Sequence, residues 1–84
     1  MKLIKISAMW CPACLIMRNI LNNIDFNIEQ IEYDYDMDED IVNEYNVGEI
    51  LPVLILVDND KEVARLIGEK SKDEVLEFLR SNVK

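Results

Sequence analysis

The sequence of 84 residues has no histidine, only two glycines and only two cysteines. Without histidine, the chain has no Ser-His or Cys-His catalytic pair and no imidazole ligand for a metal. The two glycines, Gly48 and Gly68, stand alone, which excludes the glycine-rich loops that hold phosphate groups. Two cysteines are also too few for the disulfide framework of a small secreted protein. The cysteine pair is therefore the one reactive feature that these absences leave.

Basic residues are scarce as well: nine lysines and arginines stand against seventeen aspartates and glutamates, a net charge of −8. Nucleic acids and anionic membranes bind basic surfaces, so we expect neither as a partner. The longest apolar run, residues 50–57, is much shorter than the roughly 20 residues that span a bilayer. Because the N-terminus has no signal-peptide pattern, we expect a cytoplasmic protein, and we expect it to be a monomer.

Acidic residues gather in one segment: Asp34, Asp36, Asp38, Glu39, Asp40 and Glu44. The segment lacks the glycine and the final glutamate of a calcium-binding EF-hand loop. A solvated helix start, where negative charge is favoured, explains it better than a calcium site. Steering toward a basic partner is the functional role that remains.

Half of the residues are hydrophobic, enough for one core in a single domain over residues 1–84. Four stretches have the apolar or alternating pattern of strands: 2–7, 28–34, 52–57 and 62–67. Three stretches have helical spacing: 12–22, with Leu15, Ile16, Ile20 and Leu21 as its apolar face, then 36–46 and 71–83. Asp36 with Glu39 and Ser71 with Glu74 fit reciprocal helix caps. The order β-α-β-α-β-β-α predicts an α/β fold, a sheet covered by helices.

The two cysteines, Cys11 and Cys14, are separated by two residues at the start of the first expected helix. Pro12 stands where a first helical residue tolerates proline. Cys11 would then lie at the helix N-terminus, where unpaired N–H groups and the helix dipole stabilise a thiolate, the reactive form of cysteine. Cys14, one turn later, is placed to attack a mixed disulfide at Cys11. The motif predicts dithiol–disulfide exchange, with Cys11 as nucleophile and Cys14 as resolving thiol.

Other uses of the cysteine pair fit the sequence less well. A disulfide that closes so short a loop restrains the unfolded chain very little. A zinc ion or an iron–sulfur cluster needs about four ligands, which two cysteines supply only across a dimer. A dimer that shares such a centre, or a binding module without enzymatic activity, is the alternative to an exchange enzyme.

These features resemble the thioredoxin fold in its smallest form, with the size and element order of glutaredoxins. The resemblance rests on Trp10-Cys11-Pro12-Ala13-Cys14 after a first strand and on Leu51-Pro52 at the start of the third strand. It implies a minimal thioredoxin fold, with a four-stranded mixed sheet in the order 2-1-3-4 and three helices on its two faces. It also implies a thiol–disulfide oxidoreductase that reduces protein disulfides. Such an enzyme receives electrons from a reductase or another donor and needs no cofactor besides the redox-active Cys11–Cys14 disulfide.

The resemblance further implies a cis peptide bond between Leu51 and Pro52 that faces the cysteines, with the Leu51 backbone offered to a bound substrate strand. Met9 and Trp10 are either core residues or part of an apolar rim that docks protein substrates, and we also assign substrate binding to Pro12, Ala13 and Pro52. Because Met9 and Trp10 adjoin a loop that must stay accessible, we favour the rim. Ile50 and Leu51 would form the opposite rim.

Two charged positions depart from the thioredoxin pattern. Lys5 stands where thioredoxins keep a buried aspartate, and Glu32 stands where they keep a basic residue. Lys5 either runs along apolar surface to release its ammonium at the edge of the strand, or it brings its charge to the sulfurs and stabilises a thiolate. The Pro12-Ala13 pair matches neither the Gly-Pro of thioredoxins nor the Pro-Tyr usual in glutaredoxins.

Overall fold

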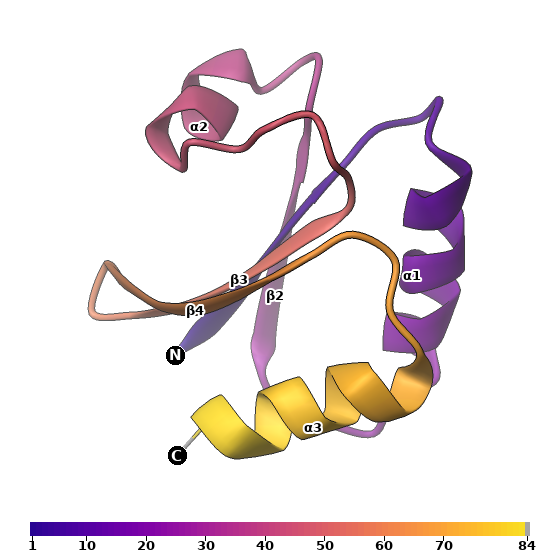
Figure 1. Cartoon of the computed structure of the whole chain (residues 1–84). Coiled ribbons are helices and arrows are strands. Elements are labelled where there is room, and N and C mark those ends of the chain that lie inside the picture. The colour runs from indigo at the N-terminus through magenta and orange to yellow at the C-terminus, as the bar shows by residue number, and fades with distance from the viewer. Residues whose placement is uncertain (84) are drawn as a thin grey trace.

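The computed structural model describes residues 1–83 and contains the expected seven elements in the expected order (Figure 1). These elements are β1 (Lys2–Ser7), α1 (Pro12–Asn22), β2 (Glu29–Asp34), α2 (Glu39–Glu44), β3 (Val53–Asp58), β4 (Lys61–Ile67) and α3 (Lys72–Asn82). The strands form one sheet in the order β2-β1-β3-β4. β1 is parallel to β2 and antiparallel to β3, and β3 is antiparallel to β4. The predicted minimal thioredoxin fold is confirmed.

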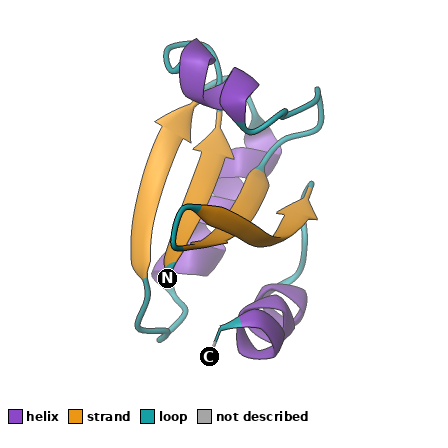
Figure 2. Cartoon of the chain, turned by 90° about the vertical axis from the view of Figure 1, so that its left-hand side faces the viewer, coloured by secondary structure: helices purple, strands orange, loops and turns teal. Residues whose placement is uncertain are grey.

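The sheet separates two groups of buried side chains. The face toward α1 and α3 carries Leu3, Met17, Leu21, Leu54, Leu56, Val75, Phe78 and Leu79. The face toward α2 carries Ile4, Ile6, Val42, Val53, Ile55 and Val57, and both cysteines pack against this second group. Figure 2 shows α2 at the end of the sheet where β1 and β2 finish. Because successive strand residues point to opposite faces, the apolar residues Val53–Val57 of β3 fill both groups.

Helix α1 buries only part of the apolar face that the sequence predicts: Leu21 is buried and Ile20 is half-buried. Cys14, Met17 and Leu21 are its buried residues, whereas Leu15 and Ile16 are about half exposed. Residues three and four positions apart share one helix face. The buried stripe and the predicted stripe therefore both have helical spacing, and they share Leu21. The sheet selects the stripe that begins at Cys14, and this choice turns the second cysteine inward.

Helix α2 begins at Glu39, so the predicted start at Asp36 is wrong. The Asp34 carboxylate accepts hydrogen bonds from the backbone N–H groups of Asp36 and Met37, at 2.9 and 3.0 Å. The Asp38 carboxylate in turn accepts from the Asp34 N–H at 2.7 Å. Aspartate side chains that bind nearby backbone favour a turn over a helix. None of the helices within residues 1–83 has the length and hydropathy needed to cross a membrane.

Strand β3 begins at Val53, one residue later than predicted, because Pro52 has no N–H for the strand ladder. Helix α3 has the predicted capping box. The Ser71 hydroxyl accepts from the Glu74 N–H at 3.2 Å, and the Glu74 carboxylate accepts from the Ser71 N–H at 3.3 Å. The start of α3 is therefore where the local sequence predicts it.

Candidate active site

Cys11 is the N-cap residue of α1, at the end of a short loop from β1. Its backbone is extended (φ −100°, ψ 108°), Pro12 is the first helical residue, and the first turn contains no acidic residue. The Cys11 sulfur accepts a hydrogen bond from the Cys14 backbone N–H at 3.3 Å. A sulfur at this position faces the unpaired N–H groups and the positive end of the helix dipole. Cys11 therefore lies at the helix start where its place in the sequence predicts it.

Cys14 lies one turn further along α1 and is 4% exposed. Burial raises the pKa of the Cys14 thiol from its ordinary 9.0 to about 12, and the adjacent Cys11 side chain acts in the same direction. The Ala8 backbone and the Arg18 charge lower this pKa but do not reverse the shift. Both cysteines are free thiols in the structure. At neutral pH the Cys14 thiol is consequently protonated.

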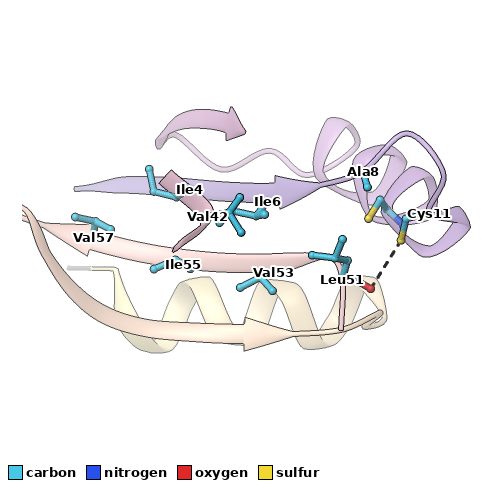
Figure 3. Packing of buried hydrophobic residues seen from close by; sticks show 10 residues of the cluster. Ile4, Ile6, Ala8, Cys11, Val42, Leu51, Val53, Ile55 and Val57 are labelled. Atoms are coloured by element: carbon cyan, nitrogen blue, oxygen red, sulfur yellow. Dashed lines mark hydrogen bonds between the residues drawn. The ribbon is translucent and has the colours of Figure 1, made fainter. Parts of the chain in front are cut away.

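The turn before β3 lies beside Cys11, because β3 is the antiparallel neighbour of β1 in the sheet. The peptide bond between Leu51 and Pro52 is cis, as the resemblance implied. The Leu51 carbonyl oxygen lies 3.9 Å from the Cys11 sulfur and accepts from its thiol, the contact drawn as a dashed line in Figure 3. The Leu51 side chain is only 7% exposed and points into the core, so the predicted apolar rim does not include it. Leu51 presents its carbonyl group to the site instead.

Exposed apolar residues adjoin Cys11 and Leu51 in the chain, whereas Cys11 itself is only 6% exposed. Met9, Trp10 and Ile50 are 87%, 60% and 64% exposed. Pro12 is also exposed, whereas Ala13 is half-buried. Trp10 is therefore a surface residue and not part of the core.

Trp10 contacts Asp36, which the sequence suggested only as a helix cap and as part of an acidic segment, and Tyr35, which it did not indicate. Its indole Nε1–H donates to the Asp36 carboxylate at 2.7 Å. Its ring meets the Tyr35 ring edge to face, with centroids 6.2 Å apart. Asp36 and Tyr35 precede α2, far from Trp10 in the sequence, and only the acidic character of their segment drew attention to it.

A family model for thioredoxin matches residues 1–81. The chain belongs to the thioredoxin family. It is 37% identical over 76 residues to Thioredoxin H2 of Arabidopsis thaliana, an alignment that covers 82% of this chain and 53% of that protein. It is 28% identical over 83 residues to a thioredoxin of Chlamydia caviae, covering 95% of this chain and 80% of that protein. The chain thus spans about half the length of the Arabidopsis relative.

Solved thioredoxin structures share the fold. The thioredoxin NaTrxh of Nicotiana alata superposes with a TM-score of 0.88 at 26% identity, over 99% of this chain and 73% of that one. Thioredoxin 1 of Thermosipho africanus superposes with a TM-score of 0.77 at 22% identity, over 96% of this chain and 92% of that one. The second likeness, at its lower identity, concerns the fold alone.

Lys5 and Glu32, the two charged residues that depart from the thioredoxin pattern, line the same cavity as Cys14. Lys5 on β1 and Glu32 on β2 are paired in the parallel register, and Lys5 is half-buried. Both line one small cavity with Cys14, Pro52 and Arg18 of α1. Lys5 shares this cavity with Cys14, but the cation that acts on the pKa of the Cys14 thiol is Arg18. Arg18 was missed by the sequence analysis, although it stands four residues after Cys14 on the same helix.

Proposed function

We propose that this chain is a thiol–disulfide oxidoreductase that reduces disulfides in protein substrates, with Cys11 as nucleophile and Cys14 as resolving thiol. The observation that carries the proposal is the Cys11 sulfur at the start of α1, bound by the Cys14 N–H and backed by the free Cys14 thiol. Membership of the thioredoxin family supports the reaction class.

In the first step, the Cys11 thiolate attacks one sulfur of a substrate disulfide. A bond forms between the Cys11 sulfur and that sulfur, the substrate S–S bond breaks, and the second substrate sulfur leaves as a thiolate that takes up a proton. The Cys14 N–H, 3.3 Å from the Cys11 sulfur, stabilises the attacking anion.

In the second step, Cys14 loses its proton and attacks the Cys11 sulfur. The Cys11–Cys14 disulfide forms, and the substrate's first sulfur leaves as a thiolate. Because burial opposes ionisation of the Cys14 thiol, few Cys14 sulfurs are ionised at neutral pH. This step is therefore sensitive to the charges around Cys14. Two electrons from a reductase or another donor return the pair to the dithiol, and the Cys11–Cys14 pair itself carries them without a bound cofactor.

We assign substrate contact to Trp10, Pro12 and Ala13 on one side of Cys11 and to Leu51 and Pro52 on the other. The exposure of Trp10 and Pro12 supports the first group. The Leu51 carbonyl, 3.9 Å from the Cys11 sulfur, supports the second. We propose that the chain works as a monomer in a reducing, cytoplasmic setting, which favours reduction of substrates over their oxidation.

The proposal is tested by reduction of insulin with dithiothreitol, followed by turbidity. We expect the wild-type protein to accelerate the reaction and Cys11→Ser to give the rate without protein, because serine is not a disulfide nucleophile. The Cys14→Ser variant should accumulate a mixed disulfide with the substrate, detected by mass spectrometry. A wild-type rate equal to the rate without protein would overturn the proposal.

A further inference from the structure

A small cavity of about 10 Å³ has Cys14 in its lining, together with residues of the sheet and of α1. Three elements bring charged side chains to its wall: Lys5 from β1, Arg18 from α1 and Glu32 from β2. The uncharged Leu54 of β3 and Pro52, which precedes β3, complete this side of the wall. The charged groups that face the Cys14 thiol across this cavity are therefore two cations and one carboxylate.

Arg18 is the cation on the same helix as Cys14. Residues four positions apart lie on one helix face, so Arg18 stands one turn beyond the Cys14 sulfur. One Arg18 Nη lies 2.8 Å from a Glu32 carboxylate oxygen, and the two side chains are 48% and 36% exposed. An ion pair this exposed contributes little to stability, typically about 0–1 kcal/mol. Its position over the cavity suggests a use other than holding the fold together.

Cys14 is the group beside the cavity that needs a neighbouring positive charge. Its burial opposes ionisation, and Arg18 lowers the pKa that burial raises. The pairing of Arg18 with Glu32 limits this help, because the carboxylate neutralises the guanidinium and itself repels an anionic sulfur.

We propose that Arg18 stabilises the negative charge that develops on the Cys14 sulfur as it attacks the mixed disulfide, and that Glu32 limits this effect by holding Arg18 in an ion pair. In that step the Cys14 S–H bond releases its proton to solvent and the Cys14–Cys11 bond forms. The bond from Cys11 to the substrate sulfur breaks, and that sulfur leaves with the electron pair. Arg18 acts on Cys14 only through its charge and is a positioning residue. The inference rests on the proposed function and adds to it the charges that govern its second step.

The proposal predicts effects of opposite sign for the two members of the pair. Arg18→Gln removes the cation and leaves the Glu32 carboxylate, so resolution by Cys14 should slow by about threefold at neutral pH. A tenfold loss of thiolate is partly offset because a more basic thiolate is a better nucleophile. Glu32→Gln frees Arg18, so resolution should accelerate by about the same factor. The double variant should return close to the wild-type rate, because both opposing charges are gone.

The experiment is a stopped-flow reaction of the reduced protein with Ellman's reagent. Attack by Cys11 releases one nitrothiobenzoate in a phase whose rate depends on reagent concentration. Resolution by Cys14 releases the second in a phase that does not. We expect the variants to change only the second phase and to shift its pH profile. In a Cys11→Ser background, the pH dependence of iodoacetamide alkylation should give a higher Cys14 pKa for Arg18→Gln and a lower one for Glu32→Gln.

Matched controls separate charge at the cavity from charge in general. Arg80→Gln on α3 and Glu29→Gln on β2 make the same chemical changes away from the cavity and should leave both phases unchanged. Arg18→Lys keeps the charge and should retain most of the second-phase rate, which excludes a fold defect in Arg18→Gln. Lys5→Gln, measured in the same assay, shows how much Lys5, the other cation at the cavity, contributes to the second-phase rate.

Three results would overturn the inference. The first is an Arg18→Gln second phase equal to wild type at every pH, and the second is an equal slowing by Arg18→Lys. The third is a slower second phase in Glu32→Gln, which would make the carboxylate a proton acceptor for Cys14. A wild-type protein that releases no second equivalent and reduces no disulfide would instead refute the proposed function itself.

Discussion

The two long helices of this protein begin in almost the same way and serve different ends. Each has 11 residues, and in each the side chain of the N-cap residue accepts a hydrogen bond from the third helical N–H. In α3 the cap is Ser71 and the third residue is Glu74, whose carboxylate closes the box. In α1 the cap is Cys11 and the third residue is Cys14, with no acid in the first turn.

The difference shows how one physical device supports either stability or reactivity. A helix start offers unpaired N–H groups and the positive end of a dipole to any nearby anion. In α3 the acids Asp73 and Glu74 take that place. The chain has seventeen acidic residues, but none of them lies in the first turn of α1. The N–H groups of this helix start are therefore available to the Cys11 sulfur.

The largest expected difference between the two helix starts concerns the free energy of unfolding at high pH, because only α1 has a titratable thiol in its first turn. Folding raises the pKa of the Cys14 thiol from 9.0 to about 12, so between these values the folded state keeps a proton that the unfolded state has released. The free energy of unfolding of the reduced protein should then fall as pH rises above about 9, by up to about 1.4 kcal/mol per pH unit. Chemical denaturation of wild type and Cys14→Ala at several pH values measures this term.

The half-buried Tyr45, whose pKa is also raised, titrates in both of those proteins, so the comparison cancels its contribution. Below pH 9 the thiol is protonated in both states and contributes no slope. Parallel pH profiles for wild type and Cys14→Ala would show that Cys14 is not protonated preferentially in the folded state.

A smaller effect should follow when the start of α1 is made to look like that of α3. Ala13→Asp places a carboxylate in the first turn, where it competes with the Cys11 thiolate for the same N–H groups and repels it. We expect alkylation of Cys11 by iodoacetamide at neutral pH to slow by roughly tenfold. Ala13→Asn, which has nearly the same shape and no charge, is the control and should stay within about twofold of wild type. Equal rates for the two variants would mean that the absence of acid from this turn has no consequence for reactivity.

The smallest effect should come from the cap of α3. Ser71→Ala removes the hydroxyl that accepts from the Glu74 N–H and should lower the free energy of unfolding by about 1 kcal/mol. Disulfide reduction should not change, because no residue of this cap lines the cysteine site. Ser71→Gly, which costs less at an N-cap, serves as the milder comparison. A loss of activity larger than the loss of stability would connect the two helix starts in a way that the contacts do not.

Local sequence predicted the features that depend on neighbouring residues. Pro12 after Cys11 predicted the start of α1, and Ser71 with Glu74 predicted the start of α3, because a cap is decided within one turn of helix. The same kind of reasoning failed at Asp36, where two patterns competed within a few residues. The Asp34 carboxylate took the N–H groups that a cap at Asp36 would have used.

The parts of the candidate site that the sequence could not predict join residues far apart in the chain. Trp10 pairs with Asp36 across 26 positions, and Arg18 pairs with Glu32 across 14. Asp36, Arg18 and Glu32 are each one of many charged residues in the sequence, and nothing near Trp10 or Arg18 marks its partner. A leucine such as Leu51 suits an apolar surface rim as well as a core, and its burial depends on what packs against it.

The sequence by itself determined the order of the strands and helices and the place of Cys11 at a helix start, since both follow from periodicity and capping within short stretches. Only the tertiary structure decided that Cys14 turns inward and meets Lys5, Arg18 and Glu32 across one cavity. The physical reason is that α1 has two apolar stripes of helical spacing, and packing against the sheet selects one of them. That selection buries a thiol, raises its pKa, and gives the charges beside it a role.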